Sequence, residues 1–152
     1  MRPHVRTWVA AGTTLVVATA VLVPLASRLE ITPATADPLA DRLGATTAGA
    51  VQVERSADGL VRFVGTEPGA PMDLGVTDPP AAADTFVRDL GADLGGPDSG
   101  LQVIGREPRA DGGVAVRYQQ FVDEIPVFGG QASVQVDGGG GVLSSLADLS
   151  SD

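Results

Sequence analysis

The second half of the chain alternates apolar and polar residues between short glycine-rich turns. In "VAVRYQQFV", residues 114–122, one face carries Val114, Val116, Tyr118, Gln120 and Val122. A period of two places alternate side chains on one side of a strand. Similar runs occupy residues 101–109, 131–136 and 142–147. Turns this short join neighbouring strands, so the pattern predicts a four-stranded antiparallel meander.

One segment before the meander has helical periodicity instead. In "TDPPAAADTFVRDLGADLGG", Asp78 is placed to cap the first turn, and Pro79 suits the first helical position. The apolar residues recur at a spacing of four, as Ala82, Phe86 and Leu90. Gly91 is expected to end the helix. The sequence therefore predicts an α+β domain, an antiparallel β-sheet meander packed against one main helix and preceded by a signal-peptide helix.

Two shorter alternating runs precede this helix. Residues 51–55 and 60–65 are joined through Ala57-Asp58-Gly59, and an Asp-Gly pair between such runs predicts a hairpin. Residues 37–50 are rich in Ala, Thr and Gly with little periodicity and predict a flexible lead-in. We therefore expect the folded domain to span residues 51–148.

The first 36 residues have the layout of a secretory signal. Basic residues at the start precede an uncharged run, residues 8–27. Ala34 and Ala36 form a small-residue cleavage site before Asp37, so we expect residues 1–36 to be a signal peptide and the protein to be secreted. An uncleaved membrane anchor is the alternative, because 20 uncharged residues can just span a bilayer.

Composition excludes several kinds of site. The net charge is −9 and all ten basic residues are arginines, which argues against binding to nucleic acid or anionic lipid. Cysteine is absent and the one histidine is His4, so these residues can build neither a typical zinc site nor a Ser–His or Cys–His pair.

Carboxylates are the remaining candidates for chemistry. Asp84, Asp89 and Asp93 lie around the end of the predicted helix, where a solvated face is the simplest interpretation. No D-x-D-x-D-G calcium loop occurs. A hydrolase that uses two carboxylates would need a cleft lined for its substrate, and the only tryptophan is Trp8. The sequence thus predicts no catalytic residue, no metal ligand and no cofactor.

The most specific stretch is "VRYQQFVDEIPVFGG", residues 116–130. It resembles the fungalysin/thermolysin propeptide (FTP) domain of secreted thermolysin-like zinc metallopeptidases, in which a V-R-Y-Q-Q strand leads through N-G-I/L-P-V-F/Y-G into another strand. The resemblance covers about residues 50–148 and is most specific over 111–130.

This resemblance implies a partner instead of a reaction. Domains of this family act as intramolecular chaperone and inhibitor of a zinc-containing catalytic domain, in cis or in trans, until they are cut off. The zinc would then belong to that catalytic domain. The resemblance implies partner contacts by the motif residues, namely Arg117, Tyr118, Gln119, Gln120, Ile125, Pro126, Val127, Phe128 and Gly129.

The chain departs from the family pattern in two respects. Asp123 and Glu124 stand where the family has Asn-Gly, which places a non-glycine residue in a left-handed turn. The sequence ends at Asp152 without an H-E-x-x-H segment, so a piece of a longer precursor and a free-standing module both remain open. A stand-alone secreted inhibitor or cell-surface binding module of the same fold is therefore the alternative function.

Overall fold

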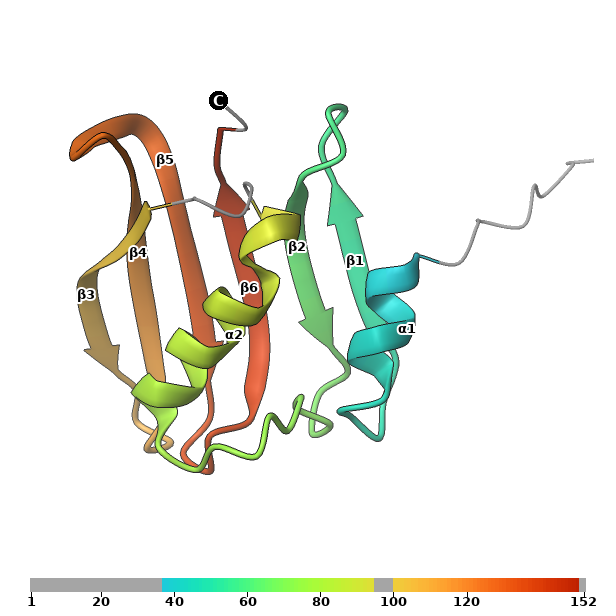
Figure 1. Cartoon of the computed structure of the whole chain (residues 1–152). Helices are drawn as coiled ribbons and strands as arrows, with labels where there is room; N and C mark the ends of the chain where they lie inside the picture. Colours follow the sequence, from blue (N-terminus) through green and yellow to red (C-terminus); the bar gives the residue numbers. More distant parts are fainter. Residues whose placement is uncertain (1–36, 95–99, 151–152) are drawn as a thin grey trace, which may run out of the picture. The chain divides into compact units, whose positions relative to one another are not determined.

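The computed structural model describes residues 37–94 and 100–150, which belong to one compact unit. Its six strands form a single antiparallel sheet in the order β1-β2-β6-β5-β4-β3 (Figure 1). The elements are α1 (Pro38–Gly44), β1 (Val51–Arg55), β2 (Val61–Thr66), α2 (Pro79–Leu94), β3 (Gly100–Pro108), β4 (Val114–Val122), β5 (Ile125–Val136) and β6 (Val142–Asp148). The predicted α+β class is confirmed. The predicted signal peptide or anchor, with its cleavage site at Ala34 and Ala36, lies outside the described residues.

The predicted meander forms the larger part of the sheet. β3, β4, β5 and β6 pair in succession through short turns. The predicted N-terminal hairpin, β1–β2, joins the same sheet because β2 pairs with β6, with Phe63 opposite Leu146 and Val64 opposite Ser145. Residues more than 80 positions apart thus become neighbours, which no local pattern indicated.

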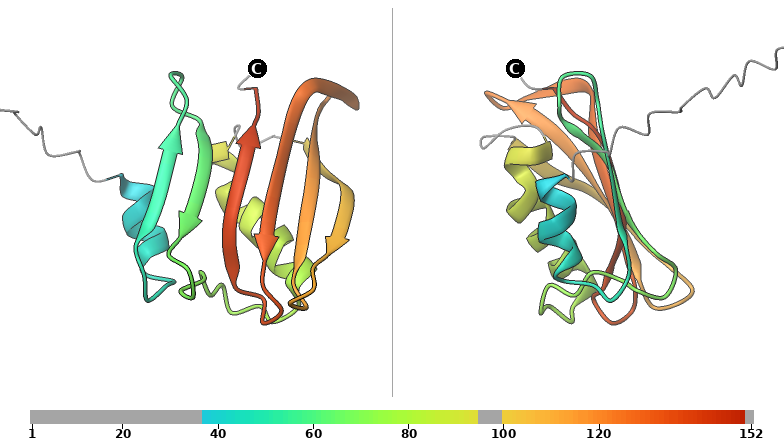
Figure 2. Two further views of the ribbon diagram at one scale, coloured as in Figure 1. Left: turned by 180° about the vertical axis from the view of Figure 1, so that it is seen from behind. Right: turned by 90° about the vertical axis from the view of Figure 1, so that its right-hand side faces the viewer.

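Both helices lie on the same face of the sheet (Figure 2). The sequence places apolar side chains on that face of every strand of the meander and on one stripe of α2. Their contact forms the core, which includes Val64, Met72, Ala82, Ala83, Phe86, Leu90, Val116, Tyr118, Val134, Val136 and Val142. The opposite face is not covered by either helix. It carries polar side chains such as Arg117 and Gln131, which contact each other.

The main helix begins as the sequence predicts and ends later. An oxygen of the Asp78 carboxylate accepts a hydrogen bond from the Ala81 amide at 3.1 Å, so Asp78 caps the first turn. The prediction that Gly91 ends the helix is wrong, because α2 continues to Leu94. Leu94 is 1% exposed, so burial of this side chain stabilises one more turn and outweighs the poor helix propensity of glycine.

The prediction of a flexible lead-in over residues 37–50 is also wrong, since α1 lies within it. Asp37 caps α1 by accepting the Leu39 amide at 2.9 Å, and Leu39 and Leu43 are buried one turn apart. A helix of seven residues is too short to show a clear period, which is why the sequence did not reveal it. None of the helices in the described ranges is long and apolar enough to cross a membrane.

Candidate partner-binding site

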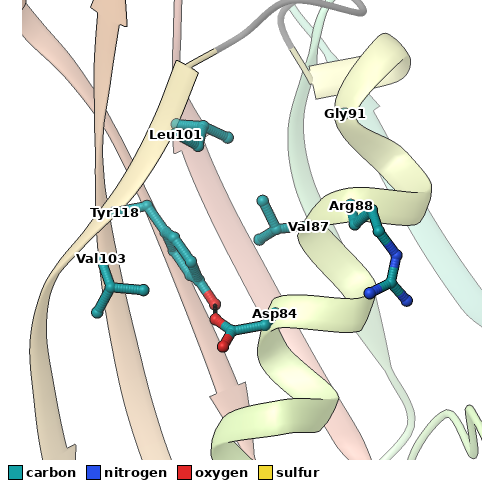
Figure 3. A pocket seen from close by; sticks show the side chains of 7 residues that line it. All are labelled: Asp84, Val87, Arg88, Gly91, Leu101, Val103 and Tyr118. Atoms are coloured by element: carbon teal, nitrogen blue, oxygen red, sulfur yellow. Dashed lines mark hydrogen bonds between the residues drawn. The ribbon is translucent and has the colours of Figure 1, made fainter.

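The V-R-Y-Q-Q segment of β4 fastens three other parts of the fold to the strand. The first is α2, through Tyr118, which is 2% exposed. Its hydroxyl donates a hydrogen bond to Oδ1 of Asp84 at 2.7 Å (Figure 3). Arg106 lies 3.7 Å from the other Asp84 oxygen. Burial of the ring, reinforced by the Asp84 carboxylate, raises the pKa of Tyr118 well above its usual value. The hydroxyl therefore remains a protonated donor and acts as a structural link.

A hollow adjoins this link between α2 and the edge strand β3. Figure 3 shows Val87 of α2 facing Leu101 and Val103 of β3 across it, and Arg88 also lines the hollow. The hollow is about 420 Å³ and is open on one side. Its polar groups are the Asp84 carboxylate, the Arg88 guanidinium and the Tyr118 hydroxyl, and this hydroxyl is already engaged by its hydrogen bond to Asp84.

The second link is made by Gln119, which fills a break in the β4–β5 pairing. Gln119 pairs with Gln131, but Phe121 pairs with Pro126, so an extra loop of β5 bulges out between them. The side-chain Nε2 of Gln119 donates to the carbonyl oxygens of Val127 at 2.7 Å and Gly130 at 2.9 Å. The amide thus replaces the missing ladder bonds and fixes the bulge.

The third link is made by Gln120, which holds the chain after β6. Its side chain is 1% exposed, donates to the Ser150 carbonyl at 2.8 Å and accepts from the Ser150 amide at 2.9 Å. Gly130 packs directly on this side chain, because a Cβ at that position would lie 2.9 Å from Oε1 of Gln120. Both glutamines therefore make the base of the hairpin rigid.

Beyond this base the β4–β5 hairpin extends past its neighbours. β3 pairs with β4 only as far as Phe121, and β6 pairs with β5 only from Gln131. Val122 pairs with Ile125 across a two-residue turn in which Asp123 and Glu124 have φ of 47° and 66°. The non-glycine left-handed turn that the sequence predicted is confirmed. Ile125 and Pro126 follow this turn directly and belong to β5.

The extended part of the hairpin exposes large apolar side chains. Val122 is 43% exposed, Ile125 is 69% exposed and Phe128 is fully exposed. Phe128 and Gly129, which has φ of 77°, line an open hollow together with Asp58 and Arg62 of the β1–β2 hairpin. Apolar residues this exposed on a rigid hairpin are typical of a surface that binds another protein.

The structure divides the predicted contact residues into two groups. Tyr118 and Gln120 are buried and Gln119 is half-buried, so these three support the hairpin from within. Arg117 points to the opposite, helix-free face, where it contacts Gln131 at 3.4 Å. On the hairpin, the predicted contact residues that remain available to a partner are Ile125, Pro126, Phe128 and Gly129, with Val127 half-buried beside them, whereas the exposed Arg117 is available only on the opposite face.

Sequence reasoning missed three residues of this surface. The alternation of β4 predicts Val122 on the same face as Val116, but Val122 lies beyond the last partner on β3 and is exposed. Asp123 and Glu124 were noted only as departures from a family pattern. The signal that could have identified them is the sequence Val122-Asp123-Glu124-Ile125, in which two acidic residues stand between two apolar ones at the point where β4 turns into β5.

Few of the described residues are arranged as a metal-binding or catalytic site would require. Within residues 37–94 and 100–150, no three His, Cys, Asp or Glu side chains gather in a way that could hold a metal ion. Of the acidic cluster on α2, Asp84 bonds to Tyr118, Asp93 pairs with Arg42 and Asp89 pairs with Arg88. Each of these carboxylates therefore has a hydrogen-bond or ion-pair partner within the domain, of which the Asp89 pair is the most exposed.

Comparison with known proteins gives one match. Residues 99–145 match the family model of the fungalysin/thermolysin propeptide motif. The matched span contains β3, β4, β5 and most of β6, and so includes the whole β4–β5 hairpin. No curated protein and no solved structure gives a significant match. The chain thus carries an FTP motif, and the resemblance identified from residues 111–130 is confirmed.

Proposed function

We propose that this chain is the propeptide region of a secreted, thermolysin-like zinc metallopeptidase precursor, and that it acts as intramolecular chaperone and inhibitor of the catalytic domain. The observation that supports this most directly is the construction of the β4–β5 hairpin. Its motif residues hold a rigid, protruding strand pair that ends in exposed apolar side chains, and they include no catalytic group. Such a surface acts by binding.

Rigidity matters for a chaperone that must present one shape to an unfolded partner. The tip is held in place before any partner arrives, because Gln119 and Gln120 fix the bulge and the adjoining chain. A preorganised surface loses little conformational entropy on binding, so more of the contact energy contributes to affinity. A catalytic domain can then fold against this template.

The position of Ser150 favours a partner connected on that side. The Gln120 side chain holds the Ser150 backbone through two hydrogen bonds. Ser150 lines the same hollow as Phe128 and Gly129. A domain joined after this point would begin next to the exposed hairpin. Tethering raises its effective concentration to roughly the millimolar range, which strengthens an intramolecular contact.

The same proposal accounts for the export of the protein and for the domain that would bind the zinc. The basic start, the apolar run and the Ala34 and Ala36 cleavage site direct the protein out of the cell, and the propeptide would act in that compartment. Zinc would be bound by the catalytic domain, since the described part of this chain has no candidate metal site. The hairpin recognises protein surface and not the metal.

The test is a refolding and inhibition assay in trans. The full chain is added to denatured, then diluted, catalytic domains of thermolysin-type and fungalysin-type zinc peptidases, with a trypsin-like serine peptidase as control. We expect recovered activity of at least one zinc peptidase to rise several-fold after the chain is removed by proteolysis, and the native enzyme to be inhibited before removal. Absence of both effects for every zinc peptidase would contradict the proposal.

A second candidate is a secreted inhibitor that acts without a folding role. The buried core of the compact unit favours it, because a domain with its own core can act in trans. The same assay separates the two functions. Inhibition of a native zinc peptidase without any gain in refolding would identify the inhibitor.

A further inference from the structure

Most of the exposed large apolar side chains in the described residues belong to one hairpin. Of the five large apolar side chains that are exposed in the described residues, Val122, Ile125 and Phe128 lie at the end of the β4–β5 hairpin. Asp123 and Glu124 form the turn between the first two. We call these five residues the tip patch. It combines an apolar surface with two carboxylates.

The surroundings of the tip patch are acidic as well. The hollow beside Phe128 is lined by Asp58, Arg62 and Asp148. Arg62 forms an ion pair with Asp148, which leaves Asp58 as a net negative charge. With the two turn carboxylates, this end of the molecule has a net charge of about −3.

We propose that the tip patch binds an apolar depression bordered by lysine or arginine side chains on the surface of the metallopeptidase catalytic domain. This inference rests on the proposed function and specifies the chemistry of its partner surface. Phe128, Ile125 and Val122 supply the area removed from water, and Asp123 and Glu124 pair with the cations at the border.

The charges argue against two other occupants of the patch. A second copy of this chain would bring two pairs of turn carboxylates together, and like charges at an interface oppose association. An anionic lipid surface would repel the same carboxylates. A cationic protein surface is the one occupant that both parts of the tip patch favour.

The conformation of the turn indicates that the Asp123 and Glu124 side chains do not stabilise the fold. Asp123 and Glu124 both have positive φ, a conformation that Asn and Gly adopt more readily. Replacing them with Asn-Gly should therefore stabilise the fold and, if the carboxylates contact partner cations, weaken binding. Stability and binding would then change in opposite directions, which a purely structural turn would not produce.

The experiment compares D123N/E124G with wild type and with D89N/E107Q, all as full chains. The control removes the same number of charges from exposed residues on α2 and β3, away from the tip patch. Binding to immobilised catalytic domain of the zinc peptidase that the wild type inhibits is measured by surface plasmon resonance at about 50 mM and about 500 mM NaCl. Urea unfolding is measured on the same samples.

We expect D123N/E124G to bind about tenfold more weakly at low salt, mainly through slower association, while its urea midpoint rises. The difference from wild type should shrink at high salt, and the control should stay within about twofold of wild type. Equal affinity of wild type and D123N/E124G at low salt would overturn the inference and leave the proposed function intact. Failure of the wild type to bind any zinc peptidase would instead overturn the proposed function, and the inference with it. Concentration-dependent dimers or vesicle binding that require the tip patch would identify one of the other occupants.

Discussion

Two of the hairpins of this sheet, β1–β2 and β4–β5, differ in how their turns are built. The β1–β2 hairpin turns through Asp58 and Gly59, and the glycine takes φ of 87° without strain. Its turn residues are small or polar. The β4–β5 hairpin turns through Asp123 and Glu124, both at positive φ, and exposes Ile125 next to the turn. The first turn follows the rules of folding, whereas the second departs from them at the position proposed to meet a partner.

The hairpins also differ in how they are attached. Ion pairs attach β1, since Arg55 donates to Asp37 at 2.7 Å and lies 3.8 Å from Asp93 of α2. Neutral amides attach the β4–β5 hairpin, through Gln119 and Gln120. Amide contacts do not titrate, so this hairpin should keep its shape when pH changes. The β4–β5 hairpin, which has the less favourable turn, is thus the one held by the hydrogen bonds of buried side-chain amides.

The largest effect is expected from removing an amide anchor. Gln120→Ala leaves the Ser150 amide and carbonyl without their partner and should lower the free energy of unfolding by about 1–3 kcal/mol. Gln102→Ala, on the exposed side of β3, is the control and should change it by less than about 0.5 kcal/mol. Urea unfolding of the full chain measures both. Equal midpoints for the two variants would show that Gln120 is no anchor.

The next largest change in stability is expected at the turn of the β1–β2 hairpin. Gly59→Ala places a Cβ on a residue with φ of 87°, where no atom lies within 4 Å of the new methyl group. The cost is therefore backbone strain alone, about 1 kcal/mol, and the urea midpoint should fall. A midpoint equal to wild type would mean that the turn adjusts at no cost.

The reverse change, from a non-glycine residue to glycine, should stabilise the β4–β5 hairpin. Glu124→Gly relieves a non-glycine φ of 66° and should raise the free energy of unfolding by about 0.5–1 kcal/mol. Thermal and urea unfolding of the full chain measure the gain. If glycine lowers stability here, the carboxylate of Glu124 contributes to folding and the contrast between the turns is incorrect.

The smallest effect is a local one at acid pH. Hydrogen bonds from the Arg55 side chain and the Leu39 amide lower the pKa of Asp37 from its ordinary 3.8 to about 2. A lowered pKa stabilises the fold above the unfolded value, and this contribution is lost as pH falls from about 4 to about 2. NMR titration should show the Leu39 amide shifting over that range, while the side-chain amides of Gln119 and Gln120 do not follow the Asp37 transition. A titration midpoint of the Asp37 carboxylate near pH 3.8 would contradict the ion pair between Arg55 and Asp37 that attaches β1.

Much of this fold could be predicted because its signals are local. The Asp78 cap, the apolar stripe of α2 and the alternation of β4 each lie within a few residues, and each appears in the structure as expected. The end of α2 was missed because Leu94 is stabilised by contacts with distant elements. The pairing of β2 with β6 depends on the whole chain and has no local signature.

The candidate site was only half predictable for a similar reason. Resemblance selected the right segment, but it did not separate residues that build the hairpin from residues that face outward. Gln119 and Gln120 are adjacent and identical in type, yet one fills a bulge and the other pins Ser150. Only the register of β4 and β5 assigns these roles, and that register shifts at the bulge between Gln119 and Phe121.

The central claim is that residues at the end of the β4–β5 hairpin contact the partner, whereas residues at its base stabilise the fold. Phe128→Ala tests this claim most directly. Phe128 is fully exposed, so its removal should change the free energy of unfolding by less than about 0.5 kcal/mol. As an apolar anchor of the interface it should matter to the partner, and inhibition of the zinc peptidase that the wild type inhibits should weaken by at least about tenfold. Unfolding and inhibition are measured on one preparation of the full chain. The account predicts unchanged unfolding with weakened inhibition, and unchanged inhibition would contradict it.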